Sequence, residues 1–122
     1  MQGVLERAIE ENPDLELSDS ILGGFGRPDV SFYSKGDLYL IEVKGGKYGS
    51  PKVQKGVGQA FLYGLHRAKK VFLAIPRNWS SKEIVHNLSN RIRGGRVPFN
   101  LILVSNPGIE IVGEVESHIK FD

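Results

Sequence analysis

The sequence predicts an α/β domain in which a central mixed β-sheet is flanked by helices. Three observations lead to this fold class. Segments with helical and with strand-type patterns alternate along the chain. Residues 30–33 and 38–44 are strand-type segments joined by the turn signal Lys35-Gly36-Asp37, which indicates a β-hairpin. Two later apolar runs, 70–75 and 101–104, have the character of buried strands.

The first half of the chain contains two expected helices and up to three strands. Val4, Leu5, Ala8 and Ile9 recur at helical spacing, so we expect a helix over 2–11 that ends at Asn12-Pro13. Residues 15–22 are ambiguous and are interpreted as a short strand. After the hairpin, Ser50 is a suitable N-cap and Pro51 suits the first helical position. This second helix is expected to reach about Arg67, with a buried stripe of Val53, Val57, Phe61 and Leu65.

The second half adds a strand, a helix and two further strands. Residues 70–75 form the expected strand, which Pro76 ends. A third helix is expected to begin at Ser80 or Ser81 and to end at Gly94-Gly95. Residues 101–104 follow as a buried strand, and 109–115 alternate as an edge strand does. The predicted order is αβββαβ with an added α and β.

Composition limits the possible classes of protein. The chain has 122 residues, a formal net charge of +2 and ordinary globular composition, which predicts one domain over 1–122. It has no cysteine, which excludes disulfides, Cys-ligated zinc and an iron–sulfur cluster. No apolar run is long enough for a bilayer and no secretory signal is visible. We therefore expect a cytoplasmic protein without a membrane partner.

Two carboxylates and an amine are placed together by the predicted hairpin. Asp29 precedes the first strand, and Glu42-Val43-Lys44 ends the second. Side chains alternate along a strand, so Glu42 and Lys44 point to the same face. Antiparallel pairing across the turn would bring Asp29 near Glu42. Each residue taken singly is also typical of an ordinary turn or surface position.

This arrangement resembles the PD-(D/E)xK nuclease superfamily. The motif stands here as Pro28-Asp29 and Glu42-Val43-Lys44, and Gln59 to Tyr63 looks like the QxxxY motif of RecB-type nucleases. The residues around the motif, Gly-x-Pro-Asp and then Glu-Val-Lys-Gly, also resemble VRR-NUC domains. The spacing between Asp29 and Glu42 is similar to that of archaeal Holliday-junction resolvases. The resemblance covers Gly26 to about Ala74. It implies a restriction-endonuclease-like core and a phosphodiester hydrolase that acts on DNA.

The resemblance also implies roles for individual residues. Asp29 and Glu42 would be carboxylate ligands of Mg²⁺, with Mn²⁺ as a substitute and the backbone carbonyl of Val43 as a third ligand. Lys44 would orient the nucleophilic water or stabilise charge that develops on the phosphate. A further acid often comes from the first helix, and we expect Glu6 here rather than Glu10. Solvent-facing glutamates are the alternative for both.

Further residues are expected to contact the substrate. Gln59 would contact a phosphate or brace the metal site, with Gln54 as a rival, and Tyr63 would order the nucleic-acid strand. Clustered cations favour phosphate contacts, although exposed lysines and arginines are common on any surface. The expected nucleic-acid-binding residues are Lys47, Lys52, Lys55, Tyr63, Arg91, Arg93 and Arg96.

The sequence therefore predicts a Mg²⁺-dependent DNA endonuclease, with junction or branched DNA as the first substrate to consider. The short chain suggests a homodimer that brings one site to each strand, and a monomer is equally compatible with the sequence. Two other classes stay open. One is a nucleic-acid-binding module with this fold and no activity, and the other is a nuclease subunit of a larger DNA-processing complex.

Overall fold

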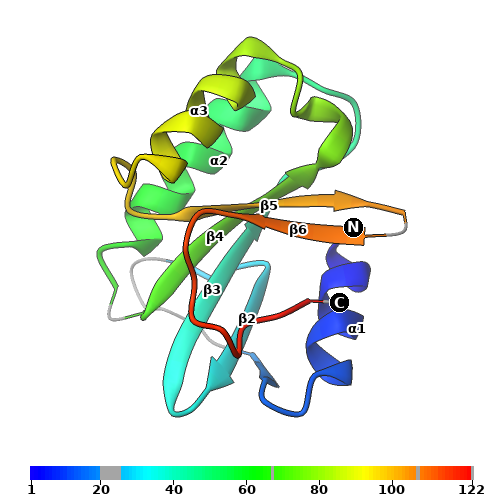
Figure 1. Cartoon of the computed structure of the whole chain (residues 1–122), viewed down its shortest axis with the longest axis vertical. Coiled ribbons are helices and arrows are strands. Elements are labelled where there is room, and N and C mark those ends of the chain that lie inside the picture. Colours follow the sequence, from blue (N-terminus) through cyan, green and yellow to red (C-terminus); the bar gives the residue numbers. More distant parts are fainter. Residues whose placement is uncertain (20–25, 67, 107, 122) are drawn as a thin grey trace.

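A computed structural model describes residues 1–19, 26–66, 68–106 and 108–121 of the chain (Figure 1). Helices and strands alternate as the sequence predicts. None of the described helices has the length and apolar character that a membrane crossing needs. In chain order the elements are α1 (Gln2–Glu11), β1 (Glu16–Ser18), β2 (Val30–Ser34), β3 (Asp37–Val43), α2 (Ser50–Tyr63), β4 (Lys70–Pro76), the 3-10 helix η2 (Arg77–Trp79), α3 (Glu83–Arg93), β5 (Asn100–Ser105) and β6 (Gly108–Val112).

The described strands form a single six-stranded sheet in the order β1-β2-β3-β4-β5-β6. Its three central strands, β3, β4 and β5, run parallel, and the remaining neighbours pair antiparallel. The α/β class with a mixed sheet is thus confirmed. The expected edge strand also lies at the edge, as β6, but it ends at Val112.

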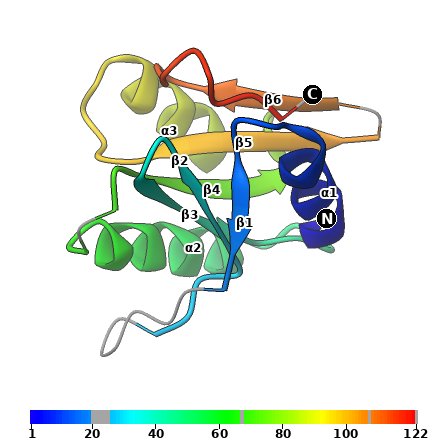
Figure 2. The same ribbon diagram turned by 90° about the horizontal axis from the view of Figure 1, so that it is seen from below.

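Each face of the sheet is covered by a different layer (Figures 1 and 2). Helices α2 and α3 pack on one face, in a core that includes Leu40 and Leu73. Helix α1 and the C-terminal segment pack on the other face, in a core that includes Tyr39 and Phe72. Adjacent residues of one strand enter different cores because side chains alternate along the strand.

Helix α2 differs from the prediction in its length and in its buried side. It ends at Tyr63, and the backbone N–H of Gly64 donates to the carbonyl of Ala60. The predicted end at Arg67 lies outside the described residues. The predicted buried stripe is wrong in its second half, since Phe61 is 47% exposed and Leu65 is 75% exposed. The side chains that α2 does bury are Val53, Gly56, Ala60 and Tyr63.

Three other boundaries differ as well. Gly49, rather than Ser50, is the N-cap of α2, and Lys82 replaces the expected serines at the start of α3. No side-chain hydrogen bond caps the start of either helix, so the side-chain capping that the serines suggested is not used. The expected strand over 15–22 is only β1, Glu16–Ser18, and its remaining part falls partly outside the described residues.

Candidate active site

The β2–β3 hairpin brings the two halves of the motif together. Val30 pairs with Ile41 in the antiparallel register, so Asp29 lies opposite the end of β3. The Oδ2 atom of Asp29 accepts a hydrogen bond from the backbone N–H of Val43 at 2.7 Å. Asp29 therefore lies beside the Glu42-Val43-Lys44 segment, as the predicted hairpin requires.

Glu42 is a buried carboxylate with a cation beside it. The residue is only 3% exposed, and its Oε2 atom lies 3.2 Å from the Nζ atom of Lys44. Burial raises the pKa of Glu42, the charge of Asp29 raises it further, and Lys44 opposes both effects. Two carboxylates and one ammonium group thus share a partly desolvated site at the end of β3.

The aliphatic stem of Lys44 packs against helix α2. Its backbone N–H donates to the carbonyl of Ala74 at 2.9 Å, which continues the β3–β4 pairing. A Cβ atom on Gly56 would lie 3.0 Å from the Cγ atom of Lys44 and 2.8 Å from the Cδ1 atom of Leu73. Glycine at position 56 therefore lets α2 pack against the stem of the lysine.

Tyr63 is a buried residue of α2 that binds the segment just before Asp29. It is 4% exposed, and its hydroxyl donates to the carbonyl of Arg27 at 3.2 Å. Burial raises the pKa of Tyr63 to about 12, with further contributions from the carboxylates of Glu42 and Asp29. This position favours a supporting role for Tyr63 over the predicted contact with a nucleic-acid strand.

Gln59 lies on the side of α2 that carries Gly56 and Tyr63, because residues three or four apart share a helix face. Its Oε1 atom is buried and has no hydrogen-bond partner among the described residues. Gln54 is exposed instead and lines a hollow with α3. The geometry therefore favours Gln59 over its rival, and its unused acceptor leaves it able to bind a water or substrate donor.

Helix α1 adds a third carboxylate near Asp29. Glu6 and Asp29 line the same hollow, of about 280 Å³, and Glu10 is not among the residues that line it. The Nε2 atom of Gln2, one turn earlier, donates to the backbone carbonyl of Asp29 at 3.1 Å. This placement supports the preference for Glu6. It also shows that α1 holds the aspartate in place through Gln2, which the sequence did not single out.

The donor set at this site suits a hard divalent cation. Within the described ranges no three His, Asp or Glu side chains are close enough to hold an ion together, so Glu6 does not complete a carboxylate triad. Asp29 and Glu42 still provide two oxygen ligands, and their mutual repulsion would be relieved by a cation. Mg²⁺ keeps several waters and needs only one or two carboxylates, so the pair fits Mg²⁺ or Mn²⁺.

The predicted basic residues do not act as one strip. The Nζ atom of Lys52 donates to the carbonyls of Gly45 and Lys47, at 3.2 and 2.9 Å, and so holds the loop that follows Lys44. Its ammonium group is therefore engaged within the protein, against the expectation of a phosphate contact. The others are exposed in two places, Lys47 and Lys55 near the motif and Arg91, Arg93 and Arg96 at the end of α3.

Two solved structures share this fold along nearly the whole chain. A crystal structure of an XisH family protein from Nostoc punctiforme has a TM-score of 0.61 at 16% identity, covering 92% of this chain and 98% of its own. An fdxN element excision controlling factor protein from Anabaena variabilis has a TM-score of 0.56 at 14% identity, covering 91% and 99%. No family model and no curated protein matches the sequence. At such identities the likeness shows the fold alone.

Proposed function

We propose that this chain is a metal-dependent DNA endonuclease with a restriction-endonuclease-like core. One observation carries the proposal. Buried Glu42 contacts Lys44 at 3.2 Å, and Asp29 is bound to the intervening backbone N–H of Val43. Burying the Glu42 carboxylate beside the negative charge of Asp29 costs stability, so a purely structural role explains the arrangement poorly. Perturbed carboxylates with a specific charge partner are typical of functional sites.

Each residue has a role in this account. Asp29 and Glu42 would hold Mg²⁺, with the carbonyl of Val43 as the predicted third ligand, and the ion would supply Lewis-acid stabilisation and an acidified water. Lys44 has an ammonium group close to the carboxylates. It can donate a hydrogen bond to the attacking water or to the phosphate oxygen on which charge develops. Gln59 offers its free Oε1 atom to hold a water or substrate donor.

The remaining contacts keep these groups in position. Tyr63 fixes the segment before Asp29 through the carbonyl of Arg27, and Gln2 fixes the carbonyl of Asp29 itself. Gly56, which has no side chain, leaves room for the stem of Lys44 against α2. Catalysis by a positioned ammonium group depends on such supports, since a displacement of about 1 Å can lower a rate roughly a hundredfold.

The names of the structural neighbours agree with a role in DNA processing. One of them is described as controlling the excision of an element, and excision is a reaction of DNA. We infer that a stand-alone core of this size acts on structured DNA, with a four-way junction or branched duplex as the first substrate to test. A homodimer would bring one site to each strand of such a substrate, and a monomer is equally compatible with the sequence.

A cleavage assay tests the proposal. Labelled four-way junction, flap, duplex and single-stranded DNA are incubated with Mg²⁺, Mn²⁺ or a chelator. The native chain is compared with Glu42→Gln, a near-isosteric change, and with Glu10→Ala as an exposed-carboxylate control on α1. We expect metal-dependent cutting by the native chain and the control, and none by Glu42→Gln. Salt-sensitive binding without cutting of any substrate would instead support a binding module or a subunit that needs a partner.

A further inference from the structure

The charges of this chain are strongly segregated, although the net charge is only +2. Residues 44–105 contain twelve of the sixteen lysines and arginines and only one of the fourteen acidic residues, Glu83. The other two parts of the chain, 1–43 and 106–122, hold the remaining four basic and thirteen acidic residues. The small net charge therefore conceals one basic and one acidic region.

The fold converts this segregation into two layers on opposite sides of the sheet. Helices α2 and α3 belong to the basic region and cover one face (Figure 1). Helix α1 and the C-terminal segment belong to the acidic region and cover the other face. The exposed cations of the α2–α3 side, here called the basic face, include Lys55, Lys82, Arg91, Arg93 and Arg96.

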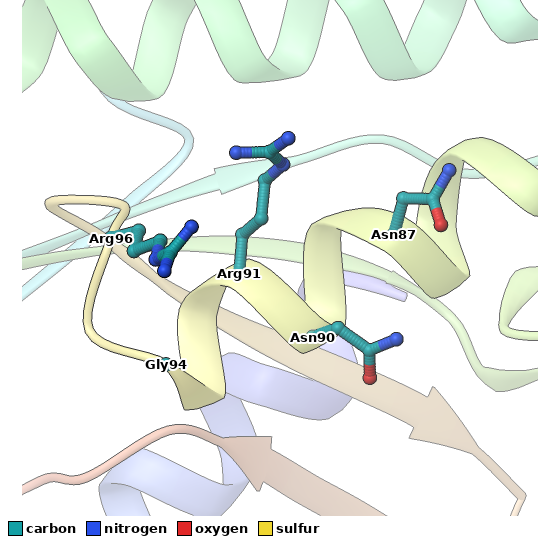
Figure 3. A pocket seen from close by; sticks show the side chains of 5 residues that line it. All are labelled: Asn87, Asn90, Arg91, Gly94 and Arg96. Atoms are coloured by element: carbon teal, nitrogen blue, oxygen red, sulfur yellow. The ribbon is translucent and has the colours of Figure 1, made fainter.

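A groove of about 580 Å³ lies on the basic face, beside the C-terminal half of α3. Figure 3 shows Arg91 rising from α3 toward the helix above it, Arg96 extending from the loop after α3, and two asparagines on α3 itself. Neither arginine forms a salt bridge with any described residue. The groove is lined by Asn87, Asn90, Arg91, Gly94 and Arg96, without a carboxylate. Its lining offers hydrogen-bond donors and positive charge, which match phosphate oxygens.

The groove shares lining residues with a series of hollows that extends toward the loop after Lys44. Asn87 also lines a second hollow, of about 420 Å³, together with Tyr48, Lys82 and the one acidic residue of this region, Glu83. Tyr48 and Lys82 in turn line a third hollow with Lys47. Lys47 belongs to the loop that follows Lys44. A run of adjoining depressions therefore leads from Arg91 and Arg96 to the loop that follows Lys44.

We propose that the basic face binds the phosphate backbone of a DNA arm beyond the cleavage site, with Arg91 and Arg96 as its main contacts. This inference rests on the proposed function, which makes DNA the substrate. Phosphate contacts of this kind set orientation without reading sequence, which suits an enzyme that recognises the shape of its DNA. The acidic layer on the opposite side is poor in cations, so the charge pattern favours the basic face as the side that holds the DNA arm.

The test measures DNA binding by two variants, each of which loses two positive charges, the first variant on the basic face and the second on the acidic layer. Fluorescence anisotropy of a labelled four-way junction is recorded in chelator, from 50 to 200 mM salt, which needs no cleavage. Arg91→Gln/Arg96→Gln removes two charges from the basic face. Arg7→Gln/Lys120→Gln removes two exposed charges from the acidic layer and leaves the net charge of the protein the same as in the first variant. Circular dichroism and thermal melts establish that both variants are folded.

We expect the first variant to bind roughly tenfold more weakly at 100 mM salt, with the log–log salt slope reduced by about 1.8, because each lost phosphate contact removes about 0.9. The control should stay within about twofold of the native affinity, with its slope unchanged. Equal losses in both variants, or no loss in the first, would overturn the proposal. The proposal would also be overturned if the native chain did not bind DNA and instead self-associated at low salt, with the basic face of one copy on the acidic layer of another.

The two proposals fail separately. A chain that cuts DNA while its binding is indifferent to Arg91 and Arg96 contradicts the basic face and retains the nuclease. A chain that binds as expected through these arginines but cuts no substrate retains the basic face and contradicts the nuclease.

Discussion

Helix α2 has two sides with different tasks, and their comparison explains how the candidate site is built. The inner side, with Gly56, Gln59 and Tyr63, touches the stem of Lys44, offers a free acceptor and holds the segment before Asp29. The outer side carries apolar residues that are open to solvent, including Phe61 and Leu62. The side with the smaller and more polar residues is the one that positions the motif.

The geometry of the helix explains why the sequence predicted a buried stripe on its outer side. An α-helix has 3.6 residues per turn, so each step of four residues advances about 40° around the axis. The apolar series Val53, Val57 and Phe61 therefore turns gradually away from the sheet, and Leu65 lies beyond the end of the helix. Val53 is fully buried, Val57 is partly buried, and exposure reaches 47% at Phe61 and 75% at Leu65. A mixture of three- and four-residue steps keeps Gly56, Ala60 and Tyr63 against the sheet.

The largest expected difference between the two sides is that between two glycines of α2. Gly56→Ala places a methyl group 3.0 Å from the Cγ atom of Lys44, whereas a Cβ atom on Gly58 meets nothing within 4 Å. We expect Gly56→Ala to lower the single-turnover cleavage rate about a hundredfold, since the ammonium group is displaced. Gly58→Ala should retain activity and raise the free energy of unfolding by about 0.8–1 kcal/mol, the helix preference of alanine.

The same methyl group would also press on Leu73, so a second variant separates the two effects. Gly56→Ala combined with Leu73→Val makes room in the core without moving Lys44. We expect the double variant to regain thermal stability and to keep the low cleavage rate of Gly56→Ala. Recovery of the cleavage rate in the pair would show that core packing, rather than the position of Lys44, limits Gly56→Ala.

The two glutamines of α2 give the next largest contrast. Gln59→Ala removes the buried, unpartnered Oε1 atom on the inner side, and Gln54→Ala changes an exposed residue on the outer side. We expect about a tenfold lower cleavage rate for Gln59→Ala, an effect in the range of a single hydrogen bond. Gln54→Ala should cut as the native chain does. Equal rates for both variants would remove Gln59 from the site.

The smallest expected effect concerns stability. Tyr63→Phe deletes the hydroxyl that donates to the carbonyl of Arg27. Urea unfolding should report a loss of about 1 kcal/mol, the usual net value of one hydrogen bond. Tyr33→Phe, at an exposed position of β2, is the matched control and should differ from the native chain by less than about 0.5 kcal/mol. A loss no greater than that of the control would show that Tyr63 does not hold this segment.

The hairpin of the site could be predicted because its signals are local. Lys35-Gly36 forms a tight turn with φ values of +52° and +83°, conformations that glycine adopts freely. The alternation of β3 then places Glu42 and Lys44 on one side, and the register brings Asp29 to them. Each step follows from residues close to one another in the sequence.

Other features depend on contacts that no local pattern encodes. Gly56 and Gly58 are equivalent in the sequence, and only the packing of α2 against β3 and β4 distinguishes them. Lys52 matched the pattern of a phosphate-binding lysine, yet its ammonium group is engaged by two backbone carbonyls. The charge segregation was visible in the sequence, but its meaning required the fold to place the two regions on opposite faces of the sheet.

The central claim is that Lys44 performs chemistry rather than holding DNA. The most direct measurement compares Lys44→Ala with Lys69→Ala in single-turnover cleavage and in DNA binding. Lys69 is an exposed lysine directly before the first residue of β4 and serves as the control. The account predicts that Lys44→Ala abolishes cleavage while its affinity for DNA stays within about threefold of the native value, as expected when one phosphate contact at most is lost. Lys69→Ala should cut normally. Metal-dependent cutting by Lys44→Ala at the native rate would contradict the account.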